Sequence, residues 1–307
     1  MSGPTIDGDL CASRLRAMRA SWTANAEPMW ANATACLLGT GSNKEDDLRY
    51  LKSASMQIWL FQYELPDTLM LFTKDELHVV TGGKKATLVS SVAEKVLADA
   101  NVTVVVHVKP KGEDGKTQVD EVVDLIAERG LIVGAVAKEA EEGALVTHAH
   151  ARLKEKGVKI VEVAAGLADA MSVRDATEAT TMKKAASLAA KAMRWCVDTI
   201  EGVVNDETKI SHAKLSEQCE DVILEPSKLG MKDVEAEDVD ICYPPILQSG
   251  GEYELKLSAQ SSDKKLHYGV VTISLGARVM QYCANVARTL MIDPTKAMED
   301  VYAAALA

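Results

Sequence analysis

Short apolar runs alternate with amphipathic stretches over residues 32–165. The runs are rich in Val, Leu and Ile, and their length suits strands that are covered on both faces. The stretches between them carry apolar residues three and four positions apart, which is typical of helices packed on a sheet. The pattern therefore predicts an α/β lobe. Its expected strands are residues 34–38, 68–72, 77–81, 102–108, 131–137 and 158–163, and its expected helices are residues 53–62, 87–99, 118–129 and 143–156. The strands at 68–72 and 77–81 flank a short polar turn and are expected to form a hairpin.

The periodicity changes after residue 172. A long helical pattern follows Asp175, and Glu178 three positions later completes the signature of a capping box. Helices followed by strands predict an α+β lobe. We therefore expect two domains, residues 1–172 and residues 173–307. The expected elements of the second are helices at 175–203 and 208–223, strands at 239–248, 270–275 and 279–286, and a last helix from residue 294.

Charge and cysteine spacing exclude several classes of function. The chain has 45 acidic and 34 basic residues and a net charge of -11, which is the wrong sign for a surface that neutralises phosphates. No preference for DNA is expected, whereas basic proteins are compatible partners. The six cysteines form no C-x-x-C pair, which fits reduced thiols rather than a zinc ribbon. The apolar runs, such as residues 131–137, are too short to cross a membrane.

The most informative stretch for chemistry is residues 239–293. The whole chain contains neither H-E-x-x-H nor G-x-S-x-G, so the common zinc protease and serine hydrolase motifs are absent. The end of the stretch instead resembles the metal-binding hairpin of the pita-bread family of creatinase, prolidase and methionine aminopeptidase, whose pattern is roughly I-D-x-G-A…Y-x-x-D-x-x-R-T. The matching residues are Gly276, Ala277, Tyr282, Arg288 and Thr289, and His267-Tyr268 resembles the substrate-binding histidine and its neighbour.

The resemblance implies that two metal-binding carboxylates of those peptidases fall on Ser274 and Asn285. Both side chains are neutral, and neither supplies the anionic oxygen that a hard cation requires. We therefore expect no metal, no cofactor and no catalytic residue. The former substrate groove, near Gly250, His267 and Tyr268, is one candidate binding site, and the face of the first lobe is another. The His-Tyr pair could equally serve only to support the fold.

Long segments elsewhere are similar to the N-terminal, peptidase-like domain of the large subunit of the FACT histone chaperone. That resemblance implies a creatinase/aminopeptidase-like two-lobe architecture, with an α/β lobe followed by a pita-bread lobe that is incomplete at its C-terminal side. The segments are residues 50–88, 108–117, 225–230 and 239–268.

The same resemblance implies a non-catalytic histone-binding role in nucleosome disassembly and reassembly during transcription, replication and repair. The implied location is the nucleus, on the chromosome, and the implied partners are core histones and their tails. The small FACT subunit is expected to bind only through regions absent from this chain. The alternative is an active metallopeptidase of the pita-bread family.

Overall fold

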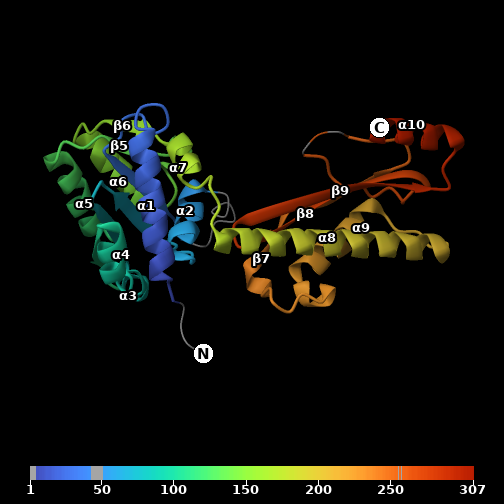
Figure 1. Ribbon diagram of the computed structural model, residues 1–307, viewed down its shortest axis with the longest axis horizontal. Coiled ribbons are helices and arrows are strands. Elements are labelled where there is room, and N and C mark those ends of the chain that lie inside the picture. The colour runs from blue at the N-terminus through green and yellow to red at the C-terminus, as the bar shows by residue number, and fades with distance from the viewer. Residues whose placement is uncertain (1–4, 43–50, 255, 257) are drawn as a thin grey trace. The chain divides into compact units, whose positions relative to one another are not determined.

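The computed structural model describes residues 5–42, 51–254, 256 and 258–307, so residue 50 at the start of one family-like segment lies outside the described residues. The chain divides into two compact units, Met1–Val173 and Arg174–Ala307, which we call the first and second units (Figure 1). Mixed α/β structure with a separate antiparallel sheet confirms the predicted fold class. Among the described residues, no helix combines the length and apolar character needed to span a bilayer.

The first unit is built on a six-stranded mixed sheet with strand order β4-β3-β2-β1-β5-β6. The predicted hairpin is confirmed, because β2 and β3 pair antiparallel and Thr73 N–H donates to the Glu76 carbonyl at 2.9 Å. The strands are β1 (Ala35–Thr40), β2 (Thr68–Phe72), β3 (Glu76–Gly82), β4 (Thr103–Lys109), β5 (Val133–Ala135) and β6 (Ile160–Glu162).

Helices cover both faces of this sheet, as Figure 1 shows. Along β1, Cys36 and Leu38 pack into one apolar core, whereas Ala35 and Leu37 pack into the other. Strand residues alternate between faces, so a strand covered on both sides is apolar throughout, as the sequence predicted. The first core contains side chains of α1 (Gly8–Ala24), α2 (Lys52–Phe61), α3 (Gly83–Ser90), α4 (Ala93–Ala100) and α7 (Ala164–Ala170), and the second contains those of α5 (Lys116–Glu128) and α6 (Ala144–Glu155).

Two predicted elements of the first unit are wrong in extent. The helix expected at 87–99 is two helices, and Val89, Val92 and Val96 lie in the same core, as their i, i+3 and i+7 spacing would place them in one continuous helix too. The strand expected at 131–137 is only β5, because the chain turns into a short 3₁₀ helix at Ala137–Glu139. The buried Glu139 carboxylate there accepts hydrogen bonds from the first backbone N–H groups of α2, which have no partner within the helix.

The second unit opens with a helix of 30 residues, α8 (Ala176–Asn205). The predicted capping box is confirmed: the Asp175 side chain accepts from Glu178 N–H at 2.8 Å, and the Glu178 side chain accepts from Asp175 N–H at 3.0 Å. The other elements are α9 (His212–Leu224), two 3₁₀ helices (Pro226–Leu229 and Ala236–Asp238), β7 (Val239–Ser249), β8 (Gly269–Val279), β9 (Tyr282–Ile292) and α10 (Lys296–Leu306).

Helices α8 and α9 pack against one face of the antiparallel sheet β7-β8-β9. Val271, Ile273 and Leu275 alternate along β8 and point into the core that these helices form. The strand expected at 279–286 is present as β9 but starts later, because the chain turns at Met280, whose φ of 53° is left-handed. Strands β8 and β9 both run longer than predicted. Because successive residues of a strand face opposite sides of the sheet, the residues of β8 that alternate with those core residues, including Ser274 and Gly276, face away from this core.

Candidate functional site

The β8–β9 hairpin carries the two positions where the peptidase pattern has metal-binding carboxylates. Ser274 pairs in register with Ala287, and Asn285 pairs with Gly276, so Ser274 and Asn285 lie on the same face of the sheet. Ser274 is half-buried, and its hydroxyl is hydrogen-bonded to the Tyr243 hydroxyl at 2.8 Å. Asn285 is exposed. The hairpin thus places the two side chains as the resemblance implies, but both are neutral.

These residues do not fit a pair of hard divalent cations. Such ions need several carboxylate oxygens, and the Ser274 hydroxyl is already engaged by Tyr243. Within the described part of the chain, no group of three or more His, Cys, Asp or Glu side chains is arranged to hold a metal ion. No step of metal-assisted hydrolysis can be derived from this hairpin.

Other residues of the matching motif have structural contacts. The Tyr282 hydroxyl donates to the Glu178 carboxylate at 3.0 Å and thereby ties the start of β9 to the start of α8. The Arg288 guanidinium donates to the carbonyl of its neighbour Ala287 at 2.8 Å. Gly276 lies close under Cys242 of the adjacent strand. The Tyr282 contact holds the sheet to α8, whereas the contacts of Arg288 and Gly276 lie within the sheet.

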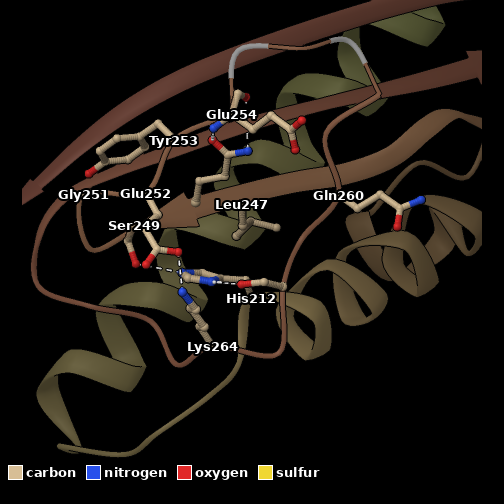
Figure 2. A pocket seen from close by; sticks show the side chains of 11 residues that line it. His212, Leu247, Ser249, Gly251, Glu252, Tyr253, Glu254, Gln260 and Lys264 are labelled. Atoms are coloured by element: carbon tan, nitrogen blue, oxygen red, sulfur yellow. Dashed lines mark hydrogen bonds and ion pairs between the residues drawn. The ribbon is translucent and has the colours of Figure 1, made fainter.

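A polar pocket of about 450 Å³ lies where α9 begins and β7 ends (Figure 2). The segment at residues 260–264 lines its other side. Because these segments are far apart in sequence, tertiary structure alone assembles the pocket. The residues that line it are His212, Leu247, Gln248, Ser249, Gly251, Glu252, Tyr253, Glu254, Gln260, Ser262 and Lys264.

His212 and Ser249 form the floor of this pocket. The His212 Nε2 atom lies 2.7 Å from Ser249 Oγ, and its Nδ1 atom lies 3.3 Å from Ser262 Oγ. Burial lowers the pKa of His212, so the imidazole is neutral at pH 7. Ser249 Oγ also accepts the backbone N–H of His267 at 2.8 Å.

The His212–Ser249 distance is that of a base and its nucleophile, but the surroundings favour a structural role. An activated serine is exposed to substrate, and its histidine is oriented by a third group that stabilises the imidazolium. Ser249 is 6% exposed, and a neutral hydroxyl, Ser262, stands where a carboxylate would serve that purpose. The network fastens the end of β7 to α9 and to the segment before β8.

The pocket is lined by two glutamates and one lysine, so its rim is acidic by one net charge. Glu252 pairs with Lys264, as Figure 2 shows, and this hydrogen bond lowers the pKa of Glu252, which is therefore ionised at neutral pH. Glu254 pairs with Lys256 at 3.0 Å, and its backbone exchanges hydrogen bonds with the Gln248 amide. All these charged side chains are exposed. Exposed ion pairs are weak, so an incoming cationic side chain can replace either lysine.

The structure brings two of the three predicted groove residues together. Gly250, with φ of +81°, lies between two pocket residues, and a Cβ atom added to it would lie 3.3 Å from His267 Cβ. The His267 ring is hydrogen-bonded to the Tyr268 carbonyl, whereas the Tyr268 side chain is 44% exposed. None of the three lines the pocket itself; Gly250 and His267 lie directly beside it. Binding at these residues stays a prediction.

Sequence reasoning missed the pocket residues that carry the most chemistry, His212, Glu252 and Glu254. His212 follows Ser211, whose side chain caps α9 at the Lys214 N–H, and this cap was the only local signal at that position. Nothing in the spacing links His212 to Ser249, which lies 37 positions further along the chain. The acidic rim lies in an irregular segment, where periodicity gives no information.

Comparison with known proteins matches both units. Residues 6–166 match the family model of the FACT complex subunit SPT16 N-terminal lobe domain, and residues 180–307 match metallopeptidase family M24. The FACT complex subunit SPT16 of Arabidopsis thaliana is 40% identical over 97% of this chain and 29% of its own length. That of Zea mays is 34% identical over 95% of this chain and 28% of its own.

Solved structures give the same relationship. The N-terminal domain of FACT complex subunit SPT16 from chickpea superposes with a TM-score of 0.86 at 36% identity, covering 97% of this chain and 70% of that one. The Xaa-Pro dipeptidase of Bacillus anthracis, at 16% identity, shares the fold with a TM-score of 0.62 over 96% of this chain and 69% of that one. The chain spans less than a third of the length of the curated relatives it matches. It belongs to the FACT complex subunit SPT16 family, whose N-terminal region is built like a peptidase.

Proposed function

We propose that this chain is a non-catalytic histone-binding module of the FACT chaperone, acting on the chromosome in the nucleus as nucleosomes are taken apart and rebuilt. Membership of the SPT16 family supports this role. So does the net charge of -11, because a negative surface attracts the Lys-rich and Arg-rich segments of core histones. The proposal includes the predicted domain boundary, with one lobe at residues 1–172 and the other at residues 173–307.

The observation that carries the proposal is the combination of a neutral hairpin with an acidic pocket in the same unit. Ser274 and Asn285 replace the carboxylates of the peptidase pattern, whereas the nearby pocket offers polar floor groups and a rim formed by Glu252 and Glu254. Such a pocket suits the cationic end of a Lys or Arg side chain from a histone tail. We infer that peptide binding is retained without peptide cleavage, with the tail passing beside Gly250 and His267.

The chain is expected to bind core histones with a dissociation constant in the micromolar range or weaker. Because the attraction is between surface charges, affinity should fall about tenfold between about 50 mM and about 200 mM salt. Fluorescence titration with folded histones at both salt concentrations measures this. Undetectable binding at low salt, or tighter binding to a DNA duplex than to histones, would contradict the proposal.

A charge-matched pair of variants separates pocket binding from general attraction. The double variant Glu252→Gln and Glu254→Gln should weaken histone binding about fivefold, as expected for two exposed charge contacts. The control is Glu94→Gln and Glu128→Gln, which changes the net charge equally at exposed positions of the first unit. Equal weakening by both double variants would place the contact elsewhere and leave only the general attraction.

A second candidate is an active metallopeptidase, which the match to family M24 favours. We expect instead that the purified protein holds no stoichiometric manganese, cobalt or zinc and releases no N-terminal residue from peptides. Elemental analysis and a peptidase assay with added metal measure both. About one or two ions per chain together with metal-dependent cleavage would establish the peptidase. The Ser274→Asp and Asn285→Asp double variant should also stay inactive, because two carboxylates supply only part of a two-metal ligand set.

A further inference from the structure

Two cysteines from strands that are not neighbours meet on one face of the β7-β8-β9 sheet. Cys242 lies on β7 and Cys283 on β9, with β8 between them, and each thiol shifts the pKa of the other. Cys283 is exposed and Cys242 is half-buried. The two cysteines are 41 positions apart in sequence, so no motif based on short cysteine spacing indicates their pairing.

Two backbone features bring these thiols together. The register of β7 on β8 shifts between Ile241 and Tyr243, so Cys242 is the extra residue of a bulge, and a bulged strand bends locally. Beneath it, Gly276 of β8 leaves the space that Cys242 fills. A Cβ atom on Gly276 would lie 2.8 Å from Cys242 Cβ and 3.1 Å from its Sγ. Cys242 therefore reaches across β8 toward Cys283.

The surroundings make Cys283 the reactive member of the pair. The Cys242 thiol donates a hydrogen bond to Cys283 sulfur and, with the Arg278 guanidinium, lowers the pKa of Cys283 to about 6, against the opposing effects of burial and of Asp240. The same hydrogen bond raises the pKa of Cys242, which stays a thiol. Arg278 is paired with Cys283 in register. Cys283 is thus an exposed thiolate at neutral pH with a thiol proton donor beside it.

The remaining cysteines offer no comparable site. Cys196 and Cys219 also contact each other, but both are fully buried in the core of the second unit. Cys11 and Cys36 are buried in the core of the first unit, and burial raises their pKa values, that of Cys11 to about 12. Neither solvent nor a modifying reagent reaches these four thiols in the folded protein.

We propose that Cys242 and Cys283 form a redox-sensitive modification site that reacts with small disulfides of the glutathione type. The Cys283 thiolate attacks one sulfur of the small disulfide, whose S–S bond breaks and releases a small thiolate. Cys242 then gives its proton to that thiolate and attacks the Cys283 sulfur, which releases the second small thiolate. The small disulfide is reduced to one thiol and one thiolate, the thiolate takes a proton from water, and the two cysteines are oxidised to one disulfide.

The closed bond would join β7 to β9 across β8. The bulge at Cys242 bends β7 locally, and closure requires the two Cα atoms to come within about 4.4–6.8 Å, the range of disulfide geometry. The site lies on the same face of the sheet as Ser274 and Asn285. Oxidation would therefore stiffen the face of the hairpin that replaces the peptidase metal site.

The test is to treat the folded, reduced protein with oxidised glutathione and to measure the intact mass. The wild type should lose two hydrogen atoms, and peptide mapping should find Cys242 joined to Cys283. The Cys242→Ala variant should instead keep one glutathione on Cys283, because the second thiol is missing. Cys283→Ala should not react while folded. Glutathione on other cysteines, or no reaction of the folded wild type while the unfolded chain reacts, would overturn the proposal.

Labelling with iodoacetamide against pH gives an independent readout. A lowered pKa means that the thiolate persists at neutral pH and is lost as pH falls through about 6, so labelling of Cys283 should reach half its maximum near that pH. Removing the hydrogen-bond donor in Cys242→Ala should move this midpoint upward and slow labelling at neutral pH about tenfold. A wild-type midpoint at the value of an ordinary thiol, unchanged in Cys242→Ala, would show that the two thiols do not interact.

Discussion

Replacing Glu178 by alanine is expected to lower the free energy of unfolding of the second unit by about 3 kcal/mol, as for a buried charge network that loses one partner. Glu178 is only 1% exposed and accepts hydrogen bonds from Arg174, from Asp175 N–H and from the Tyr282 hydroxyl. Its loss leaves these donors without their carboxylate and removes one of the two hydrogen bonds of the capping box. Denaturation in urea, followed by circular dichroism, measures the change.

Two further variants make this result specific. Tyr282→Phe removes one hydrogen bond of the same network and should cost only about 1 kcal/mol. Glu201→Ala changes an exposed glutamate on the same helix and should alter stability by less than about 0.5 kcal/mol. If Glu178→Ala were no more destabilising than Glu201→Ala, the carboxylate would not hold β9 to the start of α8.

Replacing Gly143 by alanine should destabilise the first unit by about 3 kcal/mol or more. Gly143 precedes α6 with φ of 85° and ψ of 160°, a region that is almost restricted to glycine. An added Cβ atom would also lie 2.4 Å from the Gly41 Cα atom and 3.0 Å from the Gly41 nitrogen. Both are backbone atoms, so no side-chain rotation can relieve the clash and β1 or α6 must move.

Gly157→Ala is the matched control, because Gly157 has φ of +67° and open space where its Cβ would lie. Gly157→Ala should lower the free energy of unfolding by about 1 kcal/mol, which is the cost of the left-handed backbone conformation alone. The difference between the two variants in thermal or urea denaturation therefore measures the close approach of Gly143 to Gly41 together with the extra backbone strain of the Gly143 conformation. Equal effects would mean that the two backbones are not in contact.

The sequence predicted those elements whose signals are local. The β2–β3 hairpin follows from two apolar runs around a short polar turn, and the capping box at Asp175 follows from two residues three positions apart. By contrast, α1 was missed, because its buried face includes the polar Arg14 and Ser21 and so lacks a clean apolar stripe. The buried Arg14 donates a hydrogen bond to the Trp59 carbonyl of α2, a partner that periodicity cannot reveal.

For the candidate site, the sequence by itself determined that Ser274 and Asn285 supply no carboxylate. The neutral residues at 274 and 285 can be identified without coordinates, because side-chain identity alone decides whether a carboxylate is present. Only the tertiary structure decided which other side chains of this unit come together. These are His212 with Ser249, the acidic rim around them, and Cys242 with Cys283. Such contacts depend on sheet register, a bulge and a glycine on the intervening strand, and these are set by how distant segments pack rather than by neighbours in the chain.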